Sequence, residues 1–388
     1  MFLSRPATLY GLFVLQLLLF LHLPFCAAAP QCKDLVVTVT ASANNEVFPI
    51  STDLTSSSAI SATIQTILGT TVTTFPLVPV SGTFSMSVRF CEPEVVVGSR
   101  KDTIQLLVHG VTETKLYWSG LGYPVGFNGD NYSWIAYASR QGYPTLSIDR
   151  VGNGNSTHPD PVLVTQMNLE EAILHQLVLK LKSGGAVPGR SFTRVVFVGH
   201  SYGSVLGNDM ATNHPGDIAA YVLTGYGVSV VPVAAGLPQT LLLPAALFSA
   251  RFAGLPTGYL VTSSPTGRRN YLWGADESYE QDIFLLDYNH EDVTGLGELL
   301  SITAGLKEAP SYTGPVAVIT GERDEVFCLG GLCGTGPDSP QAQSCALFPK
   351  SSNCTYYIPL DTGHMINLHY TAQGSFENAH NFLAQHGF

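Results

Sequence analysis

The chain has 388 residues, of which only 12% are charged, and its formal net charge is −11. An acidic surface poor in lysine argues against nucleic acid and anionic membranes as partners. The low charge content and the 38 glycines favour a compact, deeply buried α/β core over disorder.

Residues 1–29 have the pattern of a secretory signal peptide. Arg5 precedes an apolar run over residues 9–23, and small residues follow at 27–29. The run is short for a membrane span, although an uncleaved anchor remains an alternative. Losing Arg5 with this leader changes the net charge to −12. Because no later segment is apolar enough to span a bilayer, we expect a secreted, extracellular protein without stable membrane insertion and of unknown oligomeric state.

The cysteines indicate an oxidising compartment. Cys26 lies in the leader, and the even number that remains favours three disulfides, for which 15 pairings exist. We favour Cys32 with Cys91, and pairs among the four cysteines that crowd into one loop: Cys328, Cys333, Cys345 and Cys354. Zinc is the competing interpretation, but neither a C-x-x-C pair nor paired histidines accompany them. Three sequons are candidate glycosylation sites: Asn131, Asn155 and Asn353.

Residues 30–100 alternate between apolar and polar side chains. The stretches 35–41 and 83–90 therefore predict antiparallel strands, separated by a Ser/Thr-rich connection. We expect this β extension to pack on an edge of the main sheet, with a disulfide joining its two ends.

From residue 101 onward, strands alternate with helices. Strands are predicted at 104–108, 144–148, 195–198, 218–224, 315–320 and 355–359, and helices at 132–140, 167–181, 202–214 and 375–385. The alternation predicts an α/β fold: a mostly parallel sheet with helices on both faces and chemistry at the carboxyl ends of its strands. It breaks at residues 228–305, which we interpret as a mostly helical insertion between core segments 101–227 and 306–388.

A G-x-S-x-G pentapeptide, Gly199 to Gly203, follows the buried strand 195–198. The turn from strand to helix is so tight that positions two before and two after the serine must lack side chains. Backbone strain then lifts the Ser201 hydroxyl to the start of a helix, where it can act as a nucleophile. A plain Gly-Ser loop is the alternative.

A serine needs a base to take its proton and an acid to orient that base. We expect His364 to be the base, because it follows the last strand after Gly363. Asp324, which follows strand 315–320, is the expected acid, with Glu322 as its rival. The chain order serine, acid, histidine is that of one serine-hydrolase architecture.

Acyl transfer also needs donors for a developing oxyanion. We expect the backbone N–H groups of Tyr202 and Val111, the latter in a loop that begins His109-Gly110. The alternative for this loop is an ordinary turn.

These motifs resemble those of the α/β-hydrolase fold superfamily, especially its secreted fungal members. His109-Gly110 matches the oxyanion loop, and the turn Asp149-x-x-Gly-x-Gly-x-Ser156 matches the one after the next strand. The nucleophile elbow, the acid and the histidine loop match at Ser201, Asp324 and His364. The resemblance begins near Asp102, and it implies that residues 228–305 form a cap that sets substrate choice.

We therefore expect a secreted serine esterase that acts on a small to medium apolar carboxylic ester. A peptidase or lactonase of the same fold, or a non-catalytic extracellular binding protein, remains an alternative. A peptidase would want acids in the insertion to hold a peptide amine, and four are available: Asp276, Glu277, Glu280 and Asp282. Epoxide hydrolases are disfavoured because they need a carboxylate at position 201. Neither a phosphate loop nor a metal-binding pattern is evident, so no cofactor or metal is expected.

Overall fold

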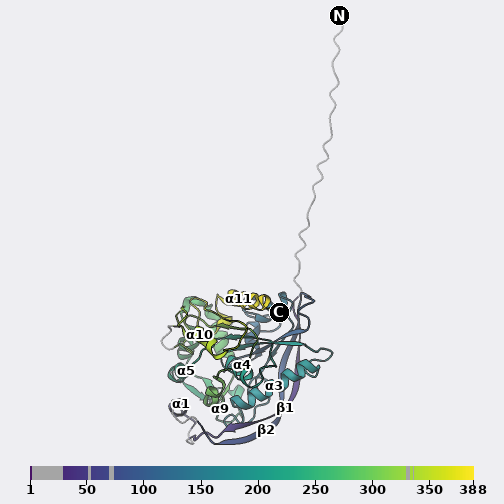
Figure 1. Cartoon of the computed structure of the whole chain (residues 1–388). Helices are drawn as coiled ribbons and strands as arrows, with labels where there is room; N and C mark the ends of the chain where they lie inside the picture. Colours follow the sequence, from purple (N-terminus) through teal and green to yellow (C-terminus); the bar gives the residue numbers. More distant parts are fainter. Residues whose placement is uncertain (2–28, 51–53, 70–73, 329–332, 335) are drawn as a thin grey trace.

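The computed structural model describes the chain except for residues 2–28, 51–53, 70–73, 329–332 and 335 (Figure 1). The predicted leader therefore lies almost entirely outside the described residues, and its processing stays a prediction. Within the described part of the chain, none of the helices combines the length and the apolar character needed to cross a bilayer.

A twisted sheet forms the centre of the molecule, and its described strands follow the order β1-β2-β4-β3-β5-β6-β10-β11. Their bounds are β1 Gln31–Glu46, β2 Leu77–Glu92, β3 Thr103–Val108, β4 Thr145–Ile148, β5 Arg194–His200, β6 Ala220–Thr224, β10 Val316–Ile319 and β11 Cys354–Tyr357. From β4 to β11 all neighbours are parallel, as predicted. Their central strands are buried apolar runs, as expected for a sheet covered on both faces.

Helices cover both faces of this sheet. The main ones are α2 Trp134–Arg140, α3 Met167–Ser183, α4 Tyr202–Asn213 and α11 Ala372–Gln385. Gln105 of β3 contacts His380 of α11, whereas a Cβ at Gly207 of α4 would touch Phe197 of β5. Phe197 pairs with Leu106, so these two side chains point to the same face of the sheet. Gln105 is adjacent to Leu106 in β3, so its side chain points to the opposite face. Thus α11 and α4 lie on opposite sides, α11 beside α2 and α4 beside α3.

The N-terminal extension is a long antiparallel ribbon. Strands β1 and β2 pair along their whole length, while only Val88 to Cys91 of β2 pair with β4. This confirms the predicted sheet edge. The connection between them contains α1 Ser57–Leu68, which the sequence analysis did not identify. This helix contacts the insertion rather than the sheet, beside α5 and α9 (Figure 1).

The insertion over residues 228–305 is built from short elements. Its helices are α5 Val231–Gly236, α6 Ala245–Phe248, α7 Pro265–Arg268, α8 Gln281–His290 and α9 Leu296–Ser301, with η2 Leu237–Thr240, η3 Ala250–Phe252, the π-helical turn η4 Arg269–Trp273, η5 Asp276–Ser278 and η6 Ile302–Gly305. Three short antiparallel strands add a small sheet that the sequence analysis did not predict: β7 Leu242–Pro244, β8 Tyr259–Thr262 and β9 Thr294–Gly295.

Loops with short helical turns complete the core, and three disulfides cross-link the chain. The loops contain η1 Lys115–Ser119, α10 Pro340–Gln343, η7 Ser344–Leu347 and η8 Ile366–Leu368. The favoured Cys32–Cys91 bridge is present, and it joins paired positions of β1 and β2. The other four cysteines pair among themselves, as expected, as Cys328–Cys333 and Cys345–Cys354.

Candidate active site

Ser201 occupies the sharp turn between β5 and α4, and its backbone has φ 54° and ψ −121°. This left-handed conformation is strained for a residue with a side chain. The Ser201 N–H donates to the carbonyl of Thr224 at 2.9 Å, which ties the turn to β6. A Cβ would lie 2.7 Å from Gly203 O at position 199 and 2.2 Å from Val108 O at position 203. Both glycines of the pentapeptide are therefore sterically required.

His364 and Asp324 form a buried pair at the carboxyl ends of β11 and β10. The imidazole Nδ1 lies 2.7 Å from Oδ2 of Asp324. The other carboxylate oxygen accepts the backbone N–H groups of Val326 and Phe327 at 2.9 and 3.0 Å. Because a carboxylate accepts, Nδ1 carries the hydrogen and Nε2 is left with its lone pair. The rival acid Glu322 instead accepts the N–H of Asp361 at 3.0 Å.

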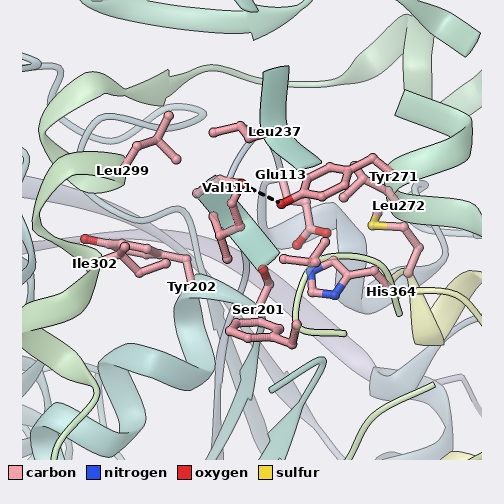
Figure 2. Close-up of a pocket in the computed structure, with 14 residues that line it drawn as sticks. Val111, Glu113, Ser201, Tyr202, Leu237, Tyr271, Leu272, Leu299, Ile302 and His364 are labelled. Carbon is pink, nitrogen blue, oxygen red and sulfur yellow. Dashed lines mark hydrogen bonds between the residues drawn. The ribbon is translucent and has the colours of Figure 1, made fainter. Parts of the chain in front are cut away.

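Ser201 and His364 line one cavity, and Figure 2 shows their side chains next to each other. No hydrogen bond joins Ser201 Oγ to the imidazole in this arrangement of the two residues. Such contacts are often long without substrate and tighten when it binds. The three side chains that the sequence analysis selected therefore lie together at the carboxyl ends of the parallel strands.

The loop after β3 presents the peptide between Gly110 and Val111 with a fixed orientation. The Gly110 carbonyl accepts from His109 Nδ1 at 2.8 Å and from the Arg150 guanidinium at 3.2 Å. In a trans peptide the N–H points opposite to the carbonyl, so these bonds also fix the direction of the Val111 N–H. Val111 borders the cavity, and within the described residues no acceptor is found for its N–H or for that of Tyr202.

His109 serves this loop as a structural residue. Its Nε2 accepts the Arg150 N–H at 3.0 Å, which places the ring hydrogen on Nδ1 and so makes it the donor to Gly110. Burial, with the nearby Arg150 cation, lowers its pKa well below the usual value and keeps the ring neutral.

Two buried arginines connect the loop to the insertion. Arg150 also pairs with Glu170 of α3 at 2.6 Å and with Glu298 of α9 at 3.3 Å. Arg268 of α7 donates to Thr112 of the loop at 2.9 Å and forms a bidentate pair with Asp287. Charges this deeply buried require such complete pairing. Neither arginine was identified from the sequence, because its partners lie far away along the chain.

Glu113 is a further cavity residue that the sequence analysis missed. Its Oε2 accepts the Gly110 N–H at 2.8 Å, so Gly110 is not available as an oxyanion donor. Its Oε1 lies 3.4 Å from Nε2 of His200. Burial lowers the pKa of His200, and the Nδ1 of that ring lies 3.1 Å from the Thr224 hydroxyl. His200 Nε2 and Glu113 Oε1 can form a hydrogen bond only when one of these two atoms carries a proton.

The rest of the cavity is apolar, and residues of the insertion form much of its wall. They are Val233, Leu237, Tyr271, Leu272, Leu299 and Ile302. Val326, Phe327 and Met365 of the core contribute the remaining apolar surface. Such a lining suits an apolar substrate group held by a few polar atoms.

The turn that begins at Asp149 is a structural support. The Asp149 carboxylate accepts from the Lys115 ammonium at 2.6 Å and from the Lys115 N–H at 2.9 Å. A Cβ at Gly154, where φ is +54°, would lie 2.4 Å from this carboxylate. Ser156 closes the turn by donating to the Asp149 carbonyl at 2.7 Å.

Other residues selected from the sequence lie away from the cavity. The sequon residues Asn131, Asn155 and Asn353 are all exposed. Asp276 pairs with Arg269, and Glu280 accepts from Tyr132 at 2.9 Å. None of the four acids considered for holding a peptide amine lines the cavity.

The fold and the strand-end elbow are those of the α/β-hydrolase class. A family model described as "Alpha/beta hydrolase family" matches residues 105–373, more than half of the chain. The chain therefore belongs to the α/β hydrolase family. A search of curated proteins finds no match.

Solved structures with the same fold have several activities. A thermophilic esterase from Thermogutta terrifontis is 12% identical with a TM-score of 0.52, covering 78% of this chain and 95% of that one. The enol-lactonase from Burkholderia xenovorans LB400 is 16% identical with a TM-score of 0.51, covering 78% and 97%. The epoxide hydrolase VrEH1 from Vigna radiata is 15% identical with a TM-score of 0.50, covering 78% and 95%. At these identities the likeness concerns the fold alone.

Proposed function

We propose that the chain is a secreted serine hydrolase that cleaves carboxylic esters through an acyl-enzyme. The observation that carries this proposal is that Ser201, on its strained elbow, lines the same cavity as the buried His364–Asp324 pair. The three disulfides are compatible with an extracellular location.

In the acylation half-reaction, Ser201 Oγ attacks the ester carbonyl carbon and His364 Nε2 takes the hydroxyl proton. Asp324 stabilises the resulting imidazolium and keeps Nδ1 as the donor. The tetrahedral intermediate collapses, the bond from carbon to the leaving oxygen breaks, and the imidazolium returns the proton to that oxygen. The alcohol departs and the acyl group stays on Ser201.

Deacylation repeats these steps with water. His364 takes a proton from the water as it attacks the acyl carbon, and then returns it to Ser201 Oγ. The free acid leaves and the serine is regenerated. In both halves the N–H groups of Val111 and Tyr202 hold the oxyanion, and each such donor is typically worth about 2.7–4 kcal/mol.

The insertion acts as a cap in this proposal and selects substrates by shape. Its apolar wall around Leu237, Leu272 and Leu299 favours an apolar acyl or alcohol group. Among the described residues that line the cavity, Glu113 is the single acid, and its Oε2 already accepts the Gly110 N–H, which disfavours recognition of a peptide amine. The ester class includes lactones, which the same chemistry opens.

The test is Ser201→Ala assayed on short p-nitrophenyl esters. We expect kcat/KM to fall by at least about 10⁴-fold, because the nucleophile is lost while the fold remains. A fluorophosphonate probe should label the wild type and not the variant. Ser183→Ala, at an exposed position of α3, serves as the control and should retain both activity and labelling.

Ester hydrolysis that survives in a folded Ser201→Ala variant would overturn the proposal. Aminoacyl-arylamides and a lactone panel run beside the esters separate the alternatives. Preferred cleavage of the arylamides would point to a peptidase. Failure of the probe to label folded wild type, with all substrates inert, would point to a binding protein.

A further inference from the structure

A second cluster of chemically active side chains lies at the far end of α4, outside the cavity. His175, His214 and Asp217 each offer a ligand atom, and these atoms lie within 4.8 Å of one another. Helix α4 has 12 residues from Tyr202 to Asn213, so at 1.5 Å per residue the cluster is about 18 Å from Ser201. Nothing in the ester-hydrolysis mechanism uses these groups.

Local geometry explains why these side chains meet. Glu171 and His175 are four residues apart on α3 and therefore share one face of that helix. His214 ends α4, and the turn that follows returns Asp217 to the same place, with the Asp217 N–H donating to the His214 carbonyl at 3.0 Å. Helices α3 and α4 pack side by side (Figure 1). The side chains of the pair on α3 therefore meet those of the pair in the turn.

The distances within the cluster are close to those of ligands around one ion. His175 Nδ1 lies 2.6 Å from Asp217 Oδ2, and His214 Nε2 lies 3.3 Å from Glu171 Oε1. Ligands at 2.0–2.1 Å from a tetrahedral zinc ion stand about 3.3 Å apart, so His175 Nδ1 and Asp217 Oδ2 would need to separate by about 0.7 Å. The two imidazoles are stacked, with centroids 3.6 Å apart.

A buried glutamate beside the cluster supplies a second observation. The Glu171 side chain is 7% exposed, and its Oε1 makes no hydrogen bond to the described residues, although His214 Nε2 lies 3.3 Å away. A buried carboxylate oxygen without a hydrogen bond is costly, and a cation held by the neighbouring ligands would offset that cost. The Lys182 ammonium, 3.7 Å from Asp217 Oδ1, neutralises part of the charge on the opposite side of the cluster.

The cluster is also accessible to ions. Glu171, His175 and His214 line an open groove whose other wall is formed by Thr40 to Ala43 of β1. An ion can therefore enter from solvent without unfolding of the core.

We propose that His175, His214 and Asp217 form a zinc site that links α3 to the turn after α4, with Glu171 beside His214. Two imidazoles and one carboxylate match the ligand preferences of Zn²⁺, whereas Ca²⁺ and Mg²⁺ prefer oxygen ligands alone. Zn²⁺ takes the place of the hydrogen between His175 Nδ1 and Asp217, and that proton is released to solvent. The sequence analysis expected no metal, because these residues form no recognisable pattern along the chain.

The experiment is calorimetric titration of Zn²⁺ into the EDTA-treated, dialysed protein. We expect one Zn²⁺ per chain with a Kd in the micromolar range or tighter, and a Tm higher by about 2–5 °C at saturation, because the ion binds the folded state. Ca²⁺ should give no saturable signal. Co²⁺ should bind with the intense visible absorption of a tetrahedral site.

His175→Ala and His214→Ala should each weaken Zn²⁺ binding by at least about 10-fold, since each removes one ligand. His290→Ala is the matched control, because this exposed helical histidine donates only to Leu286 O at 2.9 Å. Ser201→Ala should bind Zn²⁺ like the wild type, which separates this proposal from the one on ester hydrolysis. Absence of saturable binding, or equal binding in both single variants and the wild type, would overturn the site.

Discussion

The chain holds two histidine–aspartate pairs with almost the same contact and very different surroundings. In His364–Asp324 the Nδ1 to Oδ2 distance is 2.7 Å, and in His175–Asp217 it is 2.6 Å. The side chains of the first pair are 2% and 0% exposed, and those of the second are 20% and 14% exposed. The contact alone therefore assigns no role to a pair.

The neighbours of each pair make the difference. Around His364 the cavity is apolar, the carboxylate is held by two backbone N–H groups, and a serine lies alongside. Around His175 stand Asp217 and the stacked imidazole of His214, which in turn lies 3.3 Å from Glu171 Oε1. In the proposed esterase, the first setting orients one ring nitrogen toward the serine proton. In the proposed zinc site, the second supplies lone pairs to one cation.

The largest expected effect separates the two pairs by function. Asp324→Asn should lower kcat on p-nitrophenyl esters by about 10⁴-fold, because an amide no longer fixes the tautomer of His364. Its affinity for Zn²⁺ should equal that of the wild type. Steady-state kinetics and calorimetry on the same preparation measure both. A fall in kcat of less than 10-fold (about 1.4 kcal/mol) would remove Asp324 from the proposed triad.

A smaller effect is expected from loss of Arg150, which helps to orient the loop after β3. Arg150→Met should lower kcat by about 10²–10³-fold with little change in KM, because the Gly110 carbonyl loses the donor that helps to orient the Val111 N–H. Arg140→Met, which removes an outer ion pair with Asp130 and a contact with the Tyr137 ring, is the control.

Loss of folding is a separate outcome for Arg150→Met, since it leaves Glu170 and Glu298 without their cation. The double variant Arg150→Met with Glu298→Gln removes one of these unpaired charges, so that kcat can be measured if the single variant does not fold. Unchanged kcat in either folded variant would contradict the role of Arg150 in holding the loop.

The smallest effect concerns a buried histidine without any carboxylate. His380 lies 3.1 Å from the side-chain nitrogen of Gln105, and burial lowers its pKa to about 4. The folded pKa is below the usual 6.5, so the stability from this group is complete above pH 6.5 and is lost as the pH falls toward 4. The loss is on the order of 3 kcal/mol.

His380→Gln should therefore show a weaker fall in unfolding free energy between pH 7 and pH 4 than the wild type, as measured by urea denaturation at each pH. The difference arises because glutamine has no charged form to exclude from the core. If the unfolding free energy of both proteins fell equally between pH 7 and pH 4, protonation of His380 would cost nothing. That result would contradict the lowered pKa of this ring.

The sequence predicted the sheet well where strands are long, apolar and followed by motif residues. The elbow at Ser201 was predictable because a strand-to-helix turn of this shape imposes glycine at two fixed positions. The placement of His364 after the last strand followed from the same principle, since parallel strands end at one edge.

What the sequence did not predict depends on packing between distant segments. Strands β7, β8 and β9 have three, four and two residues, too short for alternation to be recognised. Helix α1 was hidden in a Ser/Thr-rich stretch. His175 and His214 look like ordinary helical residues until α3 and α4 are placed side by side.

The two arginines that join the insertion to the loop after β3 bear on how such enzymes can be re-engineered. Arg150 reaches Glu298 of the insertion, and Arg268 of the insertion reaches Thr112 of the loop. The insertion over residues 228–305 therefore cannot be exchanged between relatives by joining the chain at its two ends alone. A chimaera must carry both partners of each of these two contacts, or the graft would disturb the loop that in our proposal presents the Val111 N–H to the substrate.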